Sequence, residues 1–481
     1  MTLHEVRPSS PVHSDADTRA SGTGMTAAPG RDRPGRPMKV LMVGQPRDTF
    51  RGRGAEFGSV SIVLRALADR LAERVDLHVV APATEGITGT AASAAGYPVH
   101  HVQARGRSLY KALDLAQGLT AFGLPVFARD IYYRGYARAV ADVAAALRPD
   151  IVHIQSHPQL AMPVRSAVPE ARLVLHLHDE ALARLPAASV RRRLRPFAAV
   201  VTCSQWVAEK LRRSQPDFAG PIEPVGNGID TALFSRRRLR PEKKAKLLFV
   251  GRVSPEKGPH ILIDAFVRLA DRWPELQLVL AGPVGLMPHS FIRLVADDPP
   301  MASALPFYGR GIVDRLRRQV LHARTDLARE LQQAVPDALR SRVHWLGALP
   351  HDRIVELMGT RTILVQPSLW REAFGLPLAE AMATGVAVVA SRRGGHEELV
   401  DHEQNGVLVE AGDTEALVEA IDGLLHDPGA ARALGDRAAE DMARNVRWRI
   451  AADRLFAVWD RLVPTRAASP VRAPAPTRPD N

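Results

Sequence analysis

The chain has 481 residues, of which 46% are hydrophobic and 24% charged, and its formal net charge at pH 7 is +12. This length favours about two to three domains with sizeable cores, and no apolar run approaches the roughly 18 residues of a membrane-spanning helix. The single cysteine, Cys203, excludes an internal disulfide and fits a cytoplasmic protein. We expect it to be a small buried residue beside a strand end, not a nucleophile.

The basic residues are spread along the chain, so the charge does not indicate nucleic-acid binding. The densest run, Arg191–Arg195, has no interleaved aromatic residues on which bases could stack. We expect a helix face there that is either solvated or turned toward an anionic surface, such as acidic lipid headgroups or an anionic substrate. Of the 64 cationic residues 57 are arginine and seven are lysine, a bias typical of a GC-rich genome.

In chain order, residues 1–37 come first; they contain no apolar segment, and we expect a disordered tail rather than a secretory signal. Short apolar runs then alternate with amphipathic stretches. The first series of predicted strands comprises Met38–Gly44, Asp76–Pro82, Pro149–Gln155, Arg172–Glu180 and Ala198–Ser204. The second comprises Lys246–Gly251, Leu276–Gly282, Arg342–Gly347, Thr362–Ser368 and Val386–Ser391. Each series predicts a doubly wound, Rossmann-like α/β sheet, and two such sheets leave a cleft between them.

The domain boundaries follow from these two series. We expect an N-terminal domain at 38–235 and a C-terminal domain at 236–445, joined near a charged, turn-rich connector at 227–246. A C-terminal helix is expected at 446–463, and whether it crosses back to the N-terminal domain is left open. A second disordered tail is expected at 464–481.

Two glutamates, Glu372 and Glu380, are separated by seven residues in the stretch REAFGLPLAEAMATGVAVVAS. Pro377 suits the first position of a helix, so we predict a helix from Pro377 to Gly385 with Glu380 in its first turn. Glu372 then lies on a loop beyond a strand's carboxyl end, where parallel sheets bind ligands, and the amides of residues 374–376 lead into a helix N-terminus. The alternative is that Glu380 only complements the helix dipole and Glu372 is a solvated loop residue.

A second motif, VGRVSPEKGPHILIDAF, predicts a strand, a loop with Arg252 and Lys257, and a helix opened by Gly258. It matches neither the dinucleotide-binding nor the Walker-type glycine loop, but it shares their glycines, free amides and cations. Lys257 is informative because the chain otherwise prefers arginine, which suggests that a compact ammonium is needed there. The alternative is a solvated pair of loop cations.

Together these motifs resemble the retaining glycosyltransferase family four, which has the two-domain GT-B architecture. The resemblance runs from about Met38 to about Leu462. It is carried by EAFGLPLAEAMATG and VGRVSPEKG, and supported by PVGNGID, HWLG, QPS and RGGHEELV followed by NGVLV. It implies a metal-independent transferase without a cofactor. Such an enzyme moves a hexose with retention from a nucleotide diphosphate sugar to an acceptor hydroxyl, with a UDP-sugar favoured and a GDP-sugar second.

The resemblance also implies roles for the two glutamates and the loop between them. Glu380 would hold the ribose hydroxyls of the nucleotide. Glu372 would meet the hydroxyls of the donor sugar, assisted by the amides of Phe374, Gly375 and Leu376. Carboxylates suit this work because they are strong hydrogen-bond acceptors.

By the same resemblance, Arg252 and Lys257 grip the diphosphate and stabilise it as it leaves, which is electrostatic catalysis without a metal. The adjacent Asp297 and Asp298 are therefore expected on a surface loop and not at a metal site. No nucleophilic carboxylate is expected, unlike in retaining hydrolases.

The N-terminal half carries fewer signals. His178 matches a family histidine near the transferred sugar, the alternative being a satisfied histidine at a sheet end, and His176 is expected to be structural. Gly58 matches a glycine that lets a helix N-terminus approach donor phosphate or acceptor. The family commonly has a second glycine, where this chain has Ser59. The long segment 284–342 is larger than in many members and would shape the donor pocket rim or an oligomer contact.

The acceptor and the oligomeric state do not follow from the sequence. A lipid, a glycan and a small molecule all remain open as acceptors, and peripheral contact with an anionic membrane remains open as well. A rival from another functional class is a non-catalytic sugar-binding or coat-type structural protein on the same fold. The intact motif residues argue against it.

Overall fold

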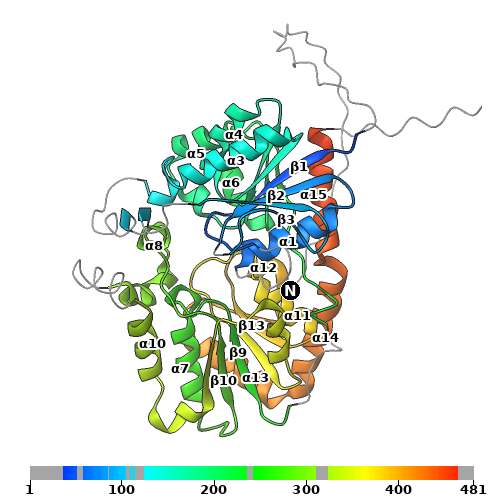
Figure 1. The fold of residues 1–481 in the computed structure, drawn as a ribbon. Helices are drawn as coiled ribbons and strands as arrows, with labels where there is room; N and C mark the ends of the chain where they lie inside the picture. The colour runs from blue at the N-terminus through cyan, green and yellow to red at the C-terminus, as the bar shows by residue number, and fades with distance from the viewer. Residues whose placement is uncertain are drawn as a thin grey trace, which may run out of the picture. The chain divides into compact units, whose positions relative to one another are not determined.

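The computed structural model describes residues 36–50, 58–84, 86–104, 109–110, 112–113, 124–235, 242–309 and 323–463 (Figure 1). The expected tails lie outside these residues apart from positions 36 and 37, and so do residues 310–322 of the long segment. The boundary predicted between residues 235 and 236 borders on 236–241, which are also outside. The described residues from Pro37 onward belong to one compact unit.

The N-terminal half is built on an eight-stranded sheet with the order β3-β4-β2-β1-β5-β6-β7-β8. Its strands are β1 Lys39–Val43, β2 Asp76–Pro82, β3 Gly89–Ala92, β4 Pro98–Val102, β5 Ile151–Gln155, β6 Arg172–Leu177, β7 Ala199–Thr202 and β8 Ile222–Pro224. All neighbours are parallel except β3 and β4. The five strands predicted here are confirmed. The other three were missed because β3 and β8 are short and β4 has two adjacent histidines at its centre.

The helices of this half are α1 Ser59–Leu71, α3 Arg134–Leu147, α4 Ala161–Ala167, α5 Ala187–Leu194 and α6 Gln205–Ser214, with short 3-10 turns η1 Val126–Ala128, η2 Pro158–Leu160 and η3 Ala181–Arg184. Helix α15, Trp448–Leu462, is the last helix described and packs against α1. Its Trp459 indole N–H donates to Nδ1 of His153 on β5 at 3.3 Å. Helix α15 thus contributes to the core of the N-terminal half.

The C-terminal half is built on a six-stranded parallel sheet with the order β11-β10-β9-β12-β13-β14. Its strands are β9 Lys246–Val250, β10 Gln277–Ala281, β11 Val343–Gly347, β12 Thr362–Gln366, β13 Ala387–Ser391 and β14 Val407–Val409. Its helices are α7 Pro259–Leu269, α8 His289–Val295, α10 Ala323–Gln333, α11 Leu376–Thr384, α12 His396–Leu399, α13 Thr414–His426 and α14 Pro428–Asn445. Short 3-10 turns are η5 Pro255–Lys257, η6 Pro299–Ser303, η7 Leu305–Tyr308, η9 Asp337–Arg342 and η10 His351–Leu357. The two sheets confirm the predicted pair of Rossmann-like domains.

Both sheets reverse their strand order next to their first strand. In the first sheet the reversal lies between β1 and β5, and in the second between β9 and β12. Open α/β sheets bind ligands at such switch points, beyond the carboxyl ends of the strands. The loops that follow these four strands are therefore where ligands are expected.

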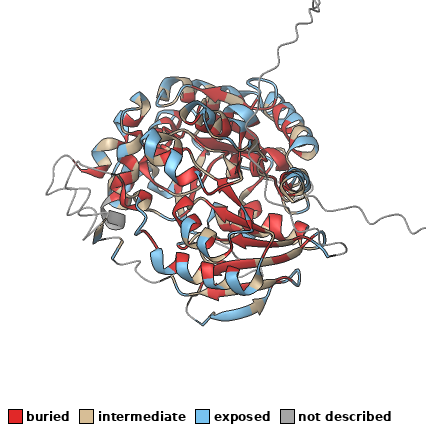
Figure 2. Cartoon of the chain, turned by 90° about the horizontal axis from the view of Figure 1, so that it is seen from above, coloured by how far each residue is buried: buried red, intermediate tan, exposed pale blue. Residues whose placement is uncertain are grey.

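The core lies along the strands and the helix faces packed on them, as the red segments of Figure 2 show. Strands β5, β12 and β13 are buried along their whole length, which is why apolar residues dominate their sequences. Within the described residues, no helix is both long and apolar enough to cross a bilayer.

The start of α11 differs from the prediction by one residue. The helix begins at Leu376, so Pro377 is its second residue and Glu380 lies in the second turn, not the first. Gly375 adopts a left-handed conformation, with φ of 99°, and the helix begins directly after it, whereas the prediction placed the start at Pro377. The end at Gly385 is confirmed.

Candidate functional site

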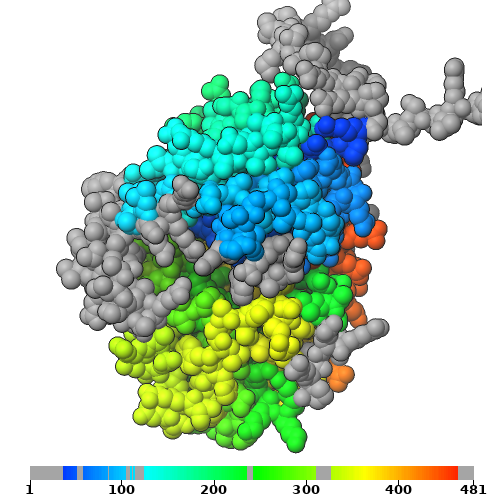
Figure 3. All heavy atoms as spheres, in the orientation of Figure 1, coloured from blue at the N-terminus to red at the C-terminus, as the bar shows by residue number. Residues whose placement is uncertain are grey.

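A cavity of about 520 Å³ lies at the carboxyl ends of the strands and is lined by both halves of the chain. Its walls come from the loops that follow β1, β5, β6, β9 and β12. In the space-filling view, blue and cyan atoms of the N-terminal half border green and yellow atoms of the C-terminal half (Figure 3). The cavity therefore coincides with the switch points of both sheets.

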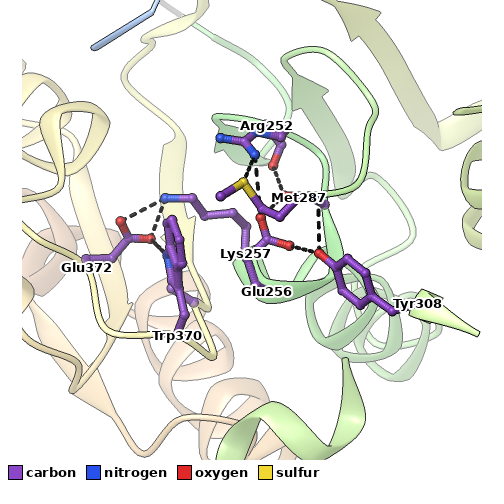
Figure 4. A network of polar contacts seen from close by, with 9 residues as sticks. Arg252, Glu256, Lys257, Met287, Tyr308, Trp370 and Glu372 are labelled. Carbon is purple, nitrogen blue, oxygen red and sulfur yellow. Dashed lines mark hydrogen bonds and ion pairs between the residues drawn. The ribbon is translucent and has the colours of Figure 1, made fainter. Parts of the chain in front are cut away.

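Lys257 and Glu372 form the polar centre of the C-terminal wall (Figure 4). The Lys257 ammonium lies 2.6 Å from Oε1 and 2.8 Å from Oε2 of Glu372. Oε1 also accepts hydrogen bonds from the Ser368 hydroxyl at 2.6 Å and from the Trp370 indole at 2.8 Å. The ammonium further lies 4.8 Å from the centre of the Trp370 ring, within cation–π range. The structure thus brings two of the predicted site residues into direct contact.

The electrostatics of this pair keep Glu372 ionised. Burial alone would raise the pKa of Glu372, but the charge of Lys257, the nearby His396 and hydrogen bonds from Lys257 and Ser368 lower it to about 2. Glu372 is only 6% exposed, so the alternative of a solvated loop residue is wrong. Oε1 receives three donors and Oε2 one, which leaves Oε2 more capacity to accept a further hydrogen bond.

Arg252 lines the same cavity on the loop after β9. Its guanidinium contacts the sulfur of Met287 and lies 4.0 Å from a carboxylate oxygen of Glu256. Glu256 is fully buried and accepts hydrogen bonds from the hydroxyls of Ser254 and Tyr308, both at 2.6 Å. Arg252 and Lys257 therefore flank a fixed, buried carboxylate (Figure 4).

The backbone of the predicted loops packs closely around these side chains. Phe374, Gly375 and Leu376 line the cavity, as predicted for the stretch before α11. A Cβ at Gly375 would lie 2.8 Å from the ring of His396, and one at Gly258 would lie 2.0 Å from the carbonyl oxygen of Pro367. Both glycines have positive φ, so a side chain at either position would be strained as well as crowded.

Glu380 is not among the residues that line the cavity. It is buried on α11, and one of its oxygens is hydrogen bonded to Nε2 of His351 at 2.5 Å. The imidazole of His351 also packs near the Phe234 ring, with centroids 5.4 Å apart. The two glutamates thus have different partners, with Glu372 held by residues at the cavity and Glu380 by His351 of η10.

His178 lines the N-terminal wall of the cavity. Its Nε2 lies 2.5 Å from the side-chain oxygen of Gln155, and burial lowers its pKa to about 3, so the ring is neutral. His176 is fully buried and hydrogen bonds to His153 at 3.2 Å. The Trp459 indole N–H, which can only donate, is hydrogen bonded to His153. The three side chains of Trp459, His153 and His176 thus form a continuous hydrogen-bonded row from α15 into the sheet. The expectation that His176 is structural agrees with this burial.

Gly58 also lines the cavity, at the start of α1, with φ of 106°. A residue that the sequence analysis missed lies beside it, because the Asp48 carboxylate would be 3.5 Å from a Cβ at Gly58. Burial raises the pKa of Asp48 to about 6, although hydrogen bonds from Ser61 and the charge of Arg47 both lower it. The N-terminus of α1 is thus occupied by a carboxyl group of the chain itself, and Ser59 also faces the cavity.

The described part of segment 284–342 supplies contacts that the sequence did not reveal. Asp297 is 83% exposed, as expected for a surface loop. Asp298 is only 8% exposed and pairs with Arg371, at 3.2 Å, and with Arg393, so the surface-loop prediction is wrong for this residue. Within the described residues, no three His, Cys, Asp or Glu side chains are grouped so as to hold a metal ion.

The structure tests two further expectations, which concern Cys203 and the arginine run Arg191–Arg195. Cys203 is buried after β7, its thiol contacts the carbonyl oxygen of Ala373, and burial raises its pKa, as expected for a structural cysteine. The run on α5 is not a uniformly solvated face. Arg193 is buried and donates to the carbonyl of Ala128, because α5 turns this residue toward η1. Arg191 and Arg192 are exposed and pair with aspartates.

Three of the residues that the sequence analysis missed lie within or beside its motifs, and a fourth does not. Glu256 lies inside SPEKG, and Ser368 and Trp370 lie inside QPSLWRE, so their positions beside Lys257 and Glu372 were a usable signal. Tyr308 offered none, since it lies more than fifty residues from Glu256 in the chain. Its role depends on tertiary packing alone.

Two family models match the chain. Residues 60–233 match Glycosyltransferase Family 4, and residues 230–441 match Glycosyl transferases group 1. A D-inositol 3-phosphate glycosyltransferase of Stackebrandtia nassauensis is 29% identical over 92% of this chain and 96% of its own. Spore coat protein SA of Bacillus subtilis is 23% identical over 68% of this chain and 82% of its own.

Solved structures share the fold. Sucrose-phosphate synthase from Thermosynechococcus elongatus superposes with a TM-score of 0.63 at 20% identity, over 88% of this chain and 99% of its own. HepE of Anabaena, solved in complex with UDP-glucose, has a TM-score of 0.59 at 20% identity, over 88% of this chain and all of its own. The two family models adjoin and together span residues 60–441, which include both sheets except the first strand of the N-terminal sheet, so the chain belongs to glycosyltransferase family four.

Proposed function

We propose that this glycosyltransferase moves a hexose, with retention and without a metal, from a UDP-sugar to an acceptor hydroxyl. The observation that carries the proposal is the contact of the half-buried Lys257 with the buried Glu372 at the switch point of the second sheet. It sets a cation and a carboxylate acceptor side by side on one wall of the cavity. A sugar diphosphate needs this combination, since one end is anionic and the other carries hydroxyls.

The proposed reaction breaks the bond between the anomeric carbon and the diphosphate and forms a bond to the acceptor oxygen on the same face. The acceptor's proton passes to the departing phosphate oxygen. Lys257 and Arg252 neutralise the charge that grows on the diphosphate, which is the task a metal performs in other transferases. Oε2 of Glu372, which has only Lys257 as donor, accepts a hydroxyl of the sugar.

The state of Glu372 argues against a covalent intermediate on this carboxylate. A carboxylate that attacks the anomeric carbon needs an oxygen free of strong donors. Each oxygen of Glu372 accepts a charged hydrogen bond from Lys257, and Oε1 accepts two more, so both are poorer nucleophiles than a free carboxylate. The geometry therefore favours a role in binding the sugar over a role in attack.

UDP is favoured over GDP because the solved structures of HepE hold UDP or UDP-glucose, although at 20% identity this likeness transfers to the chain only as a proposal. The acceptor stays at the level of a hydroxyl on a small molecule, glycan or lipid. The named relative acts on an inositol phosphate, which supports a polar acceptor. A cytoplasmic location, with or without contact to an anionic membrane, fits the single buried thiol.

The second candidate is a non-catalytic, coat-type protein on the same fold, and the relative named spore coat protein SA favours it. A non-catalytic protein does not require a half-buried lysine in contact with a buried glutamate at a cavity. Lys257, Glu372 and Arg252 all line one cavity, and this arrangement supports the enzyme.

A thermal-shift panel of UDP- and GDP-sugars tests the proposal. A ligand at 100 times its dissociation constant adds about 2.7 kcal/mol to the free energy of unfolding, which gives a clear rise in melting temperature. Release of UDP from the sugar that binds is then measured with water or candidate alcohols as acceptor. Stabilisation without any UDP or GDP release would favour the coat-type protein, and no stabilisation by any sugar nucleotide would contradict both candidates.

A further inference from the structure

Segment 284–309 contacts the loop after β9, which carries Arg252 and Glu256, at two points. Met287 contacts the guanidinium of Arg252, and Tyr308, at the end of η7, donates its hydroxyl to Glu256 at 2.6 Å (Figure 4). The same hydroxyl accepts a longer hydrogen bond from the backbone N–H of Met287, at 3.4 Å. The proposed function leaves this network without a task.

Glu256 is a buried carboxylate with defined partners. It is 0% exposed, and its two oxygens are occupied by Ser254 and Tyr308. Its carbonyl oxygen accepts the backbone N–H groups of Leu369 and Trp370, at 2.9 and 3.2 Å. Glu256 therefore ties the loop after β9 to the loop after β12, which carries Glu372.

The distance between Arg252 and Glu256 is the decisive observation. The guanidinium approaches the carboxylate no closer than 4.0 Å and remains 38% exposed at the cavity. A buried carboxylate without enough donors would draw the arginine into a tight, bidentate pair. Because two hydroxyls already satisfy Glu256, Arg252 stays directed toward the cavity.

We propose that Tyr308 is a positioning residue for the donor diphosphate: its hydroxyl satisfies Glu256 and thereby leaves Arg252 free to bind phosphate. The inference rests on the proposed function, since it needs a nucleotide diphosphate at Arg252. It also gives part of the long segment a role in setting donor affinity. Tyr308 never touches the ligand and acts through Glu256 and Arg252.

The aromatic ring of Tyr308 also has a packing role that is separate from the role of its hydroxyl. Tyr308 is buried in the apolar cluster of the C-terminal half. Tyr308→Phe keeps that packing and removes only the hydroxyl. A matched control exists in the other half, where the buried Tyr97 donates its hydroxyl to Asp69 at 2.9 Å, away from the cavity-lining residues.

The test compares binding of UDP and of uridine, by titration calorimetry and by nuclear magnetic resonance, in the parent, Tyr308→Phe, Arg252→Ala and the double variant. GDP and guanosine replace them if the sugar-nucleotide panel selects GDP. Tyr308→Phe should weaken UDP binding about tenfold, equivalent to about 1.4 kcal/mol. Uridine binding should stay within twofold of the parent, because uridine carries no phosphate for Arg252 to hold. Tyr97→Phe should change neither.

The double variant decides whether Tyr308 acts through Arg252. In the Arg252→Ala background, Tyr308→Phe should cause no further loss of UDP binding. Equal losses for UDP and uridine, or a full additional loss in the double variant, would overturn the inference and leave a structural role. An unchanged UDP affinity in Tyr308→Phe would overturn the inference alone, whereas a parent that binds neither UDP nor GDP would remove the proposed function with it.

Discussion

Replacing Lys257 separates its two tasks, which are to stabilise a buried carboxylate and to bind the leaving diphosphate. Lys257→Ala removes the charged partner of Glu372, while Ser368 and Trp370 remain as donors. Breaking a buried ion pair by removing one partner is strongly destabilising, because the other charge stays buried. We therefore expect both lower stability and lower activity.

The size of the stability loss follows from the pKa of Glu372. The pKa is lowered from 4.5 to about 2, and each unit corresponds to about 1.36 kcal/mol, so the ionised form is favoured by about 3 kcal/mol. A lowered pKa contributes stability above about pH 4.5 that is lost as the pH falls through about 2. Lys257 provides the largest lowering effect, and Lys257→Ala should thus cost about 2 to 3 kcal/mol at pH 7.

Urea unfolding measures this loss, and the double variant Lys257→Ala with Glu372→Gln is its control. The double variant should recover most of the lost stability, since no unpaired charge remains buried. The deficit of the single variant should also shrink as the pH is lowered, because Glu372 takes up a proton there. A deficit that does not respond to Glu372→Gln would mean that Lys257 stabilises the loop in another way.

Turnover is measured as UDP release and should fall about 100- to 1000-fold in Lys257→Ala, the usual range for a lost charge stabiliser. Lys257→Arg should restore only part, because the ammonium lies between both oxygens of Glu372 and close to the Trp370 ring. A planar, larger guanidinium does not fit the same place. Turnover of Lys257→Arg within twofold of the parent would refute the need for a compact charge, and unchanged turnover in Lys257→Ala and Arg252→Ala would refute the diphosphate assignment.

The other charged groups of the site govern the response to chelators, to charge removal and to pH. UDP release should survive EDTA, and a loss that magnesium or manganese restores would contradict metal independence. Glu380→Gln should mainly weaken UDP binding, whereas Glu372→Gln should mainly slow transfer, so equal effects on UDP affinity would show the roles to be misassigned. Burial lowers the pKa of His351, but the charge and hydrogen bond of Glu380 raise it overall, with Arg65 opposing and Asp352 assisting. The stability that this pair contributes is full below about pH 6.5 and is lost as the pH rises through the raised pKa. UDP affinity should rise over that window, and His351→Asn should remove the pH dependence.

Strand positions could be predicted wherever burial on both faces leaves a short run that is dominated by apolar residues. Strands β5, β9 and β12 were found in this way, each within about two residues. Strands β3 and β4 could not be, since they form an antiparallel edge pair whose residues are partly exposed. The predicted start of α11 was one residue late. The left-handed conformation of Gly375 sets the start of the helix at Leu376, and the preference of Pro377 for the first helical position does not.

Within the site, most of the residues that local motifs predicted line the cavity, Glu380 being the exception, but the motifs did not predict the partners that hold them. The spacing of SPEKG and of the two glutamates pointed to Lys257 and Glu372, which lie in contact. Asp298 could not be predicted, because its burial results from two arginines that follow it by more than seventy residues. Side chains whose partners come from distant segments have no local pattern to reveal them.

The different partners of Glu372 and Glu380 have a physical meaning for a long ligand. The motif suggested two acceptors facing one crevice, yet Glu380 projects from the second turn of α11 toward His351 and is absent from the cavity wall. Sugar and ribose lie at opposite ends of a diphosphate, so two carboxylates that bind them should be apart. In this structure His351 is hydrogen bonded to the Glu380 oxygen that would accept a hydrogen bond from a ribose hydroxyl. A diol that replaced the imidazole would keep the buried carboxylate hydrogen bonded, so nucleotide binding at Glu380 would exchange one partner for another and not create an unpaired charge.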